Sequence, residues 1–179
     1  MGRYLWWKWF LAGGLSLVLC GGCSVIDSSV APSLSTNATW AVLPFVNLTE
    51  TPQAGRRVEV ISTSLLSAMG VKALLQYSPA KEEPVAGFGF ETGTREAALS
   101  WAKSQQVRYA LTGAVDEWRY KVGVDGEPAV GVTLQVIEVE TGAVVWRGVG
   151  AQAGWGREAV SAVAQKLIRN LLEQARLSI

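Results

Sequence analysis

Histidine is absent from the 179-residue chain, and cysteine occurs only twice, as Cys20 and Cys23. Without histidine, the Ser-His-Asp and Cys-His nucleophile systems of hydrolases cannot form. A structural zinc site needs about four ligands, so the two cysteines alone are insufficient. The phosphate-binding patterns GxxxxGK[ST] and GxGxxG are missing as well. The sequence therefore predicts a protein that is not an enzyme and holds no metal or cofactor.

The chain also lacks an excess of charge of either sign. It carries 16 Lys and Arg against 15 Asp and Glu, a formal net charge of +1, so no basic field for nucleic acid is expected. Adjacent carboxylates occur at Asp116 and Glu117 on a predicted strand. Neighbouring strand residues point to opposite faces, so we expect these two not to share a glycosidase-like site.

A hydrophobic run long enough to cross a bilayer is missing from the N-terminal region. Residues 11–19 are apolar and follow Arg3 and Lys8, but a membrane-spanning helix needs about 20 residues. This pattern is typical of a bacterial secretory signal, and it places the CxxC pair at the end of a leader rather than in a redox domain.

The end of this leader predicts the site of lipid attachment. Lipoprotein signal peptidase requires small residues before the modified cysteine. Cys23 follows two glycines, whereas Cys20 follows the bulky Leu19. We therefore predict a lipoprotein signal peptide over residues 1–22, with a covalent lipid on Cys23. The absence of aspartate after Cys23 favours the periplasmic face of the outer membrane. Ordinary secretory cleavage with a free Cys23 is the alternative.

The remaining sequence predicts a tether and one mixed α/β domain. Residues 23–39 are rich in Ser, Thr and Ala, so we expect a flexible tether with a span of about 22 Å. The domain, 40–179, is predicted as a mixed sheet of about five strands with three helices, in the order β-α-β-α-β-β-β-α. Pro44 predicts a bulge or an edge position, and Thr94 predicts a helix N-cap. The predicted strands are 40–47, 73–77, 109–122, 128–139 and 144–151, and the predicted helices are 56–69, 95–105 and 157–177.

Two features of the domain suggest surface contacts. Trp155 lies between Gly154 and Gly156, so its indole is expected to project. An exposed indole suits the headgroup layer of the outer membrane, although Trp155 folding back on the domain or filling a subunit contact is the alternative. Asp125 and Glu127 lie at a predicted hairpin tip. Repeated around an oligomer, this tip would form a negative ring that attracts a cationic polymer; an ordinary solvated turn is the alternative.

Three segments together resemble a known family: "WAVLPFVNLTE", "REAALSWAKSQQVRYALTGAV" and "GVTLQVIEVETGAVVWRG". They are similar to the periplasmic domain shared by the curli-secretion lipoprotein CsgG and its relatives. Within this group, "LPFVNLTETPQAG" and the short chain look most like the PelC branch, the outer-membrane lipoproteins of Pel exopolysaccharide export.

The resemblance implies a homo-oligomeric ring that guides Pel, a partly deacetylated and hence cationic polysaccharide. Its partner would be the outer-membrane export protein PelB. In this interpretation Cys23 anchors each subunit, Trp155 contacts the membrane, and an acidic face toward the periplasm concentrates the polymer. Candidates for that face are Asp125, Glu127, Glu82 and Glu83. The alternative function is that of a monomeric lipoprotein activator of a periplasmic synthase.

Overall fold

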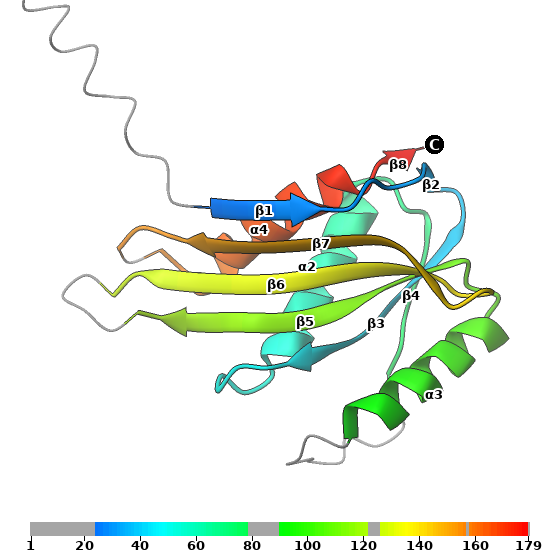
Figure 1. Cartoon of the computed structure of the whole chain (residues 1–179), viewed down its shortest axis with the longest axis horizontal. Coiled ribbons are helices and arrows are strands. Elements are labelled where there is room, and N and C mark those ends of the chain that lie inside the picture. The colour runs from blue at the N-terminus through cyan, green and yellow to red at the C-terminus, as the bar shows by residue number, and fades with distance from the viewer. Residues whose placement is uncertain (1–23, 79–89, 122–125, 157, 179) are drawn as a thin grey trace, which may run out of the picture.

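A six-stranded mixed sheet forms the centre of the molecule, in the order β1-β7-β6-β5-β3-β4 (Figure 1). The computed structural model describes residues 24–78, 90–121, 126–156 and 158–178, with the backbone alone for 90–94. The strands are β1 Ser24–Ser28, β3 Thr39–Asn47, β4 Ala73–Gln76, β5 Tyr109–Tyr120, β6 Pro128–Glu138 and β7 Ala143–Ala153. The helices are α2 Ala54–Ala68, α3 Phe90–Ser104 and α4 Val160–Gln174.

The connections between the strands explain the mixed sheet. β3 pairs in parallel with β4 and with β5, and helical crossovers α2 and α3 join these strands. β5, β6 and β7 then form an antiparallel meander. A separate small sheet pairs β2, Leu34–Ser35, with β8, Leu177–Ser178. The predicted fold class and three helices are confirmed, whereas the main sheet has six strands rather than about five.

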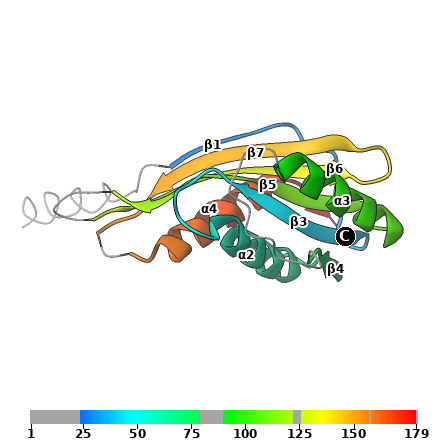
Figure 2. The same cartoon turned by 90° about the horizontal axis from the view of Figure 1, so that it is seen from below.

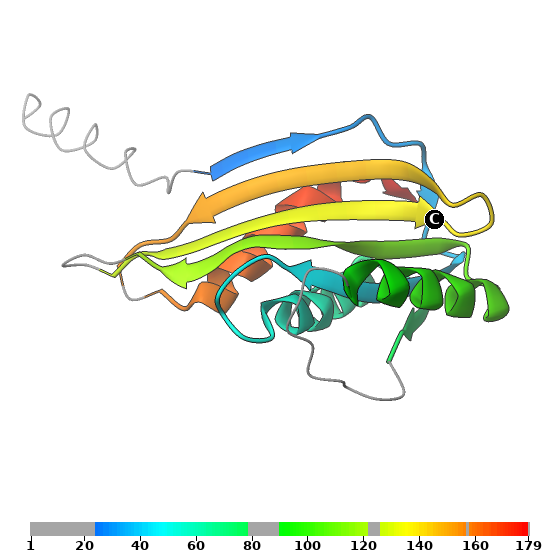
Figure 3. The ribbon, with the colours of Figure 1, turned by 60° about the horizontal axis from the view of Figure 1, so that its bottom comes forward.

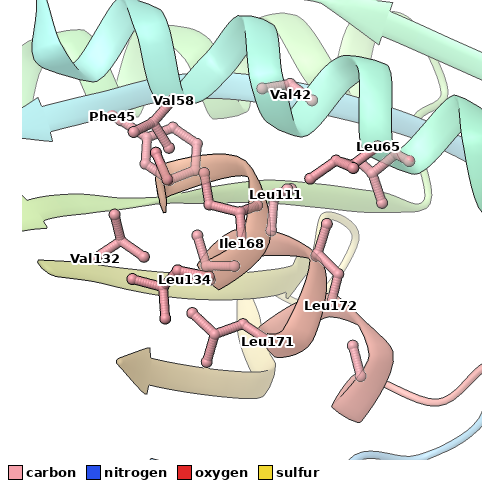
Figure 4. Packing of buried hydrophobic residues seen from close by; sticks show 14 of the residues in the cluster. Val42, Phe45, Val58, Leu65, Leu111, Val132, Leu134, Ile168, Leu171 and Leu172 are labelled. Atoms are coloured by element: carbon pink, nitrogen blue, oxygen red, sulfur yellow. The ribbon is translucent and has the colours of Figure 1, made fainter. Parts of the chain in front are cut away.

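Helices cover the two faces of the sheet unequally. Val42 and Leu111 belong to the large core beneath α2 and α4, whereas their neighbours Ala41 and Ala110 belong to a smaller core beneath α3. Because neighbouring strand residues point to opposite faces, the two cores lie on opposite sides of the sheet. Figure 4 shows the large core, where Leu171 and other α4 side chains meet β6 and α2. Figure 2 shows α2 and α4 together on one side of the strands.

The N-terminal segment differs from its prediction. Ser24–Ser28 forms β1 and pairs antiparallel with β7, with Ser24 opposite Gln152. Farther along, Ala31 and Leu34 are buried. The expectation of a flexible tether over residues 23–39 is therefore wrong for the described part of that segment. The segment is rich in serine, but the unpaired backbone groups at the edge of β7 give β1 hydrogen-bond partners, and Ile26 packs against the large core.

Two local predictions, a bulge at Pro44 and a helix N-cap at Thr94, have different outcomes. The β3–β5 register shifts between Val42 and Phe45, which confirms the bulge predicted at Pro44. Thr94 lies inside α3, which begins at Phe90, so the predicted N-cap is wrong. The helix begins five residues before the predicted start at 95. No helix in the described ranges is long and apolar enough to cross a membrane.

Candidate functional site

One end of the sheet gathers the start of the described chain and the exposed tryptophan. β1 starts at Ser24, opposite Gln152 of β7, and Trp155 follows the end of β7 by two residues. The backbone N–H of Gly154 donates to the carbonyl of Pro128 at 2.8 Å, which brings the start of β6 to the same place. This end of the sheet, marked by Ser24, Trp155 and Glu127, is called the anchor end below, and it lies at the left in Figure 1.

Trp155 projects from a loop that hydrogen bonds hold in place. Its side chain is 60% exposed, as the flanking glycines predict. The phenol of Tyr120 donates to the Glu158 carbonyl at 3.0 Å, and the Glu158 N–H donates to the Trp155 carbonyl at 3.0 Å. Lys166 contacts the Glu158 carboxylate at 2.6 Å, and this hydrogen bond lowers the pKa of Glu158. These contacts connect the backbone at Trp155 and Glu158 to β5 and α4.

Of the four predicted acidic residues, only Glu127 lies in the described part of the chain. Glu127 is exposed and lies at the anchor end, beside the strand that leads to Trp155. The structure therefore places Glu127, predicted for an acidic face toward the periplasm, at the same end of the sheet as Trp155. In an antiparallel meander the β5–β6 turn and the end of β7 must lie at the same end. Cys23, Glu82, Glu83 and Asp125 lie outside the described residues.

A groove with acidic walls lies on the face of the sheet opposite α2 and α4. It has a volume of about 1100 Å³ and is lined by β1, β5, β6, β7 and the loop after β3. We call it the acidic groove, because its charged residues are Asp27, Glu50, Asp116, Glu117 and Arg119. α3 covers the other end of this face, where Ala110 and Ile137 are buried (Figure 3). The described residues that line the groove include none from α3.

A β-bulge places two carboxylates in this groove together. The β5–β6 register shifts between Val115 and Glu117, so Asp116 is an extra residue in β5. A Cβ atom added to Gly131 would lie 3.6 Å from the Cβ of Asp116 and 3.4 Å from that of Glu117. Both side chains therefore share one face, contrary to the expectation from simple alternation. Asp116 accepts a hydrogen bond from Thr133 at 3.0 Å, and Glu117 pairs with Arg119 at 2.8 Å.

A second groove of about 830 Å³ opens toward the helices. We call it the basic groove, because the charged residues among its described lining are Arg56, Arg57 and Arg119. Val60 and Tyr120 are exposed there, and Tyr120 lies on the same face of β5 as the buried Trp118. Within the described ranges, Arg56 pairs with Glu59, whereas Arg57 makes no salt bridge.

Both grooves were missed by sequence reasoning. The acidic groove depends on β1 and on the bulge, and neither has a pattern of alternating side chains. One signal was present, since Gly131 interrupts the valines of β6 directly beside the bulge, where its Cβ position adjoins Asp116 and Glu117. In the sequence, Arg56 and Arg57 at the start of α2 have only the spacing of a solvent-exposed helix face, which does not indicate a groove.

The comparisons with solved structures relate this fold to one family. The PelC dodecamer from Paraburkholderia phytofirmans is 39% identical over 88% of this chain and 100% of that chain, with a TM-score of 0.74. A single-residue variant of the same dodecamer is 38% identical over 87% of this chain and 100% of its own, with a TM-score of 0.75. The chain belongs to the PelC family.

The PelC fold also occurs in a more distant lipoprotein. Lipoprotein GNA1162 from Neisseria meningitidis is 15% identical over 76% of this chain and 96% of its own, with a TM-score of 0.53, which indicates a shared fold alone. No protein-family model matches the chain, and no curated protein matches it. Membership of the PelC family therefore rests on the two solved PelC structures.

Proposed function

We propose that this chain is a non-enzymatic outer-membrane lipoprotein that assembles into a ring and guides a cationic polysaccharide, Pel, to the export protein PelB. The proposal rests on one observation in a chain of the PelC family: the first strand after the predicted lipid site starts at the same end of the sheet, the anchor end, as the exposed Trp155. The predicted lipid site, Cys23, immediately precedes β1, and β1 begins beside the strand that leads to Trp155. The assembly of the related PelC chains as dodecamers supports the ring.

The lipid and the indole together give each subunit a defined orientation. A lipid on Cys23 would fix one point of the subunit to the membrane, and a second contact at Trp155 would restrict its tilt. An indole has an apolar body and a polar N–H, which suits the headgroup layer. With the anchor end against the periplasmic face of the outer membrane, Glu127 lies close to the membrane. The hairpin tips of neighbouring subunits would then place negative charge around the entrance to the export pore, where it attracts a cationic polymer.

The alternative of a monomeric activator that reaches a periplasmic synthase has less support. Such a protein needs a long tether between its lipid and its folded domain. Here β1 begins at Ser24, directly after the predicted lipid site, and the following segment is fixed by the burial of Ala31 and Leu34. A domain held this close to the bilayer is better suited to a partner in the same membrane.

A charge reversal at the hairpin tip tests the guiding role. Glu127→Lys should reduce the amount of cationic glycan exported by cells while leaving the protein level and the oligomer unchanged. Glu140→Lys is the matched control, because Glu140 is exposed at the opposite end of the sheet, in the turn between β6 and β7. Export would be measured as cell-surface glycan. Equal export by the two variants would contradict a guiding role for the tip.

A binding measurement tests the choice of polymer. Chitosan oligosaccharides are cationic glycans, and fully acetylated chitin oligosaccharides of the same length are neutral controls. The assembled protein should bind the cationic probe, and added salt should weaken binding because exposed charges are screened. Equal affinity for both probes would contradict recognition by charge.

A further inference from the structure

We propose that the acidic groove of one copy receives the basic groove of the next copy, and that this head-to-tail contact builds the ring. This inference rests on the ring of the proposed function and adds the two surfaces that form it. The grooves carry opposite charge. Asp27, Glu50, Asp116 and Glu117 line one, and Arg56 and Arg57 line the other, with Arg119 shared between them.

The two grooves open on opposite faces of the sheet and adjoin at the end of β5, where Thr51, Trp118 and Arg119 line both. In β5, Asp116 and Glu117 point away from α2 and α4, whereas Trp118 belongs to the core beneath these helices. The basic groove lies beside α2 and the start of α4, so its residues belong to the helical side. Contact between two different surfaces of identical chains is heterologous, and it forms a ring when the rotation between neighbours closes. Because the two grooves are different surfaces, a contact between them is of this heterologous kind.

Both grooves also expose apolar side chains that a protein partner would cover. Eight large apolar residues are exposed in the described part of the chain, and five of them line the grooves. Val25, Leu48 and Val149 lie in the acidic groove, and Val60 and Tyr120 lie in the basic groove. Exposed apolar groups with a polar rim are typical of protein–protein contacts, in which Tyr and Arg are enriched.

A second copy fits these surfaces better than a glycan does. A cationic glycan would explain the carboxylates of the acidic groove, but it explains neither the exposed valines nor the arginines on the other face. A neighbouring copy explains all three features, because each groove then meets the complementary charge and covers apolar area. The dodecamer formed by the related PelC of Paraburkholderia phytofirmans, as wild type and as a single-residue variant, is consistent with a second copy as the occupant.

Charge reversal and rescue test the contact in the absence of membrane and polymer. The mature chain with Cys23→Ala would be studied by native mass spectrometry and sedimentation over a range of concentrations. Arg57→Glu or Asp116→Lys alone should raise the concentration needed for assembly at least about tenfold, because like charges then face each other. The double variant should restore assembly. Arg169→Glu and Glu140→Lys, exposed outside both grooves, are controls that should assemble normally.

The possible outcomes distinguish failure of the groove contact from failure of the ring itself. A wild-type chain that stays monomeric at high concentration contradicts the ring and hence the proposed function. A wild-type oligomer that both single reversals leave intact overturns the groove contact but not the ring. Single reversals that dissociate the oligomer without rescue in the double variant also overturn the proposed pairing.

Disulfide cross-linking between neighbouring copies provides a second test, which depends less on the affinity between the copies. The mature Cys23→Ala chain has no other cysteine, so Asp116→Cys with Arg57→Cys introduces a single pair. Cross-linking needs Cα atoms within about 7 Å. Mild oxidation should link neighbouring copies into a ladder of oligomers. Glu140→Cys with Arg169→Cys is the matched control pair, and equal ladders from both pairs would contradict the contact.

Discussion

Glu59 is a buried carboxylate whose removal should reveal how the bulge in β3 is held. The residue is only 6% exposed, and its Oε1 atom accepts a hydrogen bond from the backbone N–H of Phe45 at 3.1 Å. Its Oε2 atom lies 3.2 Å from the Arg56 guanidinium, which is about half exposed. Phe45 directly follows Pro44, where the strand register shifts. Glu59 thus connects α2 to the irregular part of β3.

Two substitutions separate the hydrogen bond from the charge. Glu59→Leu removes the acceptor for the Phe45 N–H, and an unsatisfied buried donor costs about 1–3 kcal/mol in the free energy of unfolding. Glu59→Gln keeps a carbonyl oxygen that can accept this bond and removes the buried charge. At neutral pH we therefore expect Glu59→Leu to be clearly destabilising and Glu59→Gln to be close to neutral or stabilising.

The pH dependence has a defined sign. Burial raises the pKa of Glu59 above its ordinary value of 4.5, against the lowering effects of the Phe45 N–H and of Arg56. Between pH 4.5 and the raised pKa, the folded chain binds a proton that the unfolded chain does not. Stability from this group is therefore present below pH 4.5 and is lost as pH rises through the raised pKa, with a slope of at most about 1.4 kcal/mol per pH unit.

Urea unfolding of wild type and Glu59→Gln between pH 4 and pH 8 measures this effect. The stability of Glu59→Gln relative to wild type should increase as pH rises above 4.5 and then become constant. Glu140→Gln is an exposed control that should show no such trend. A difference independent of pH, or one that grows toward low pH, would refute the assignment of a buried charge at Glu59.

Two further predictions concern the sheet and the anchor end. Gly113→Ala should lower the free energy of unfolding, measured in urea titrations, by at least about 2 kcal/mol. The new Cβ would lie 1.9 Å from the Thr133 carbonyl oxygen and would push β5 away from β6. A change below about 0.5 kcal/mol would contradict this strand pairing. Trp155→Ala should leave stability within about 0.5 kcal/mol, since the side chain is exposed, but should weaken binding of the Cys23→Ala chain to phospholipid vesicles. Val144→Ala, exposed at the far end of β7, is its control, and equal binding by both variants would exclude a membrane role for Trp155.

Elements with a side-chain pattern could be predicted from the sequence. Val130, Val132, Leu134 and Val136 alternate along β6, and all four are buried in the large core. The bulge at Pro44 could be predicted because proline cannot donate to a strand ladder. Such features are local consequences of residue type and spacing.

Features that depend on tertiary pairing could not be predicted in this way. In β1 the residues on either side of Ile26 are exposed, so the strand lacks the alternation of buried and exposed side chains that predicts a strand. It is held instead by backbone pairing with the edge of β7. The shared face of Asp116 and Glu117 arises from one extra residue in β5 relative to β6. A single strand does not reveal such a mismatch, because the register belongs to the pair.

The pairing of β1 with β7 leaves almost no slack between Cys23 and the folded body. With the proposed lipid in place and Trp155 in the headgroup layer, the copies would share a similar height and tilt on the bilayer. Neighbours would then meet by lateral diffusion, with rotation about the membrane normal as the main freedom left to match. Since free chains lose several kcal/mol of translational and rotational freedom on association, we expect rings to form on a membrane at sparse surface density even where dilute chains in solution remain apart.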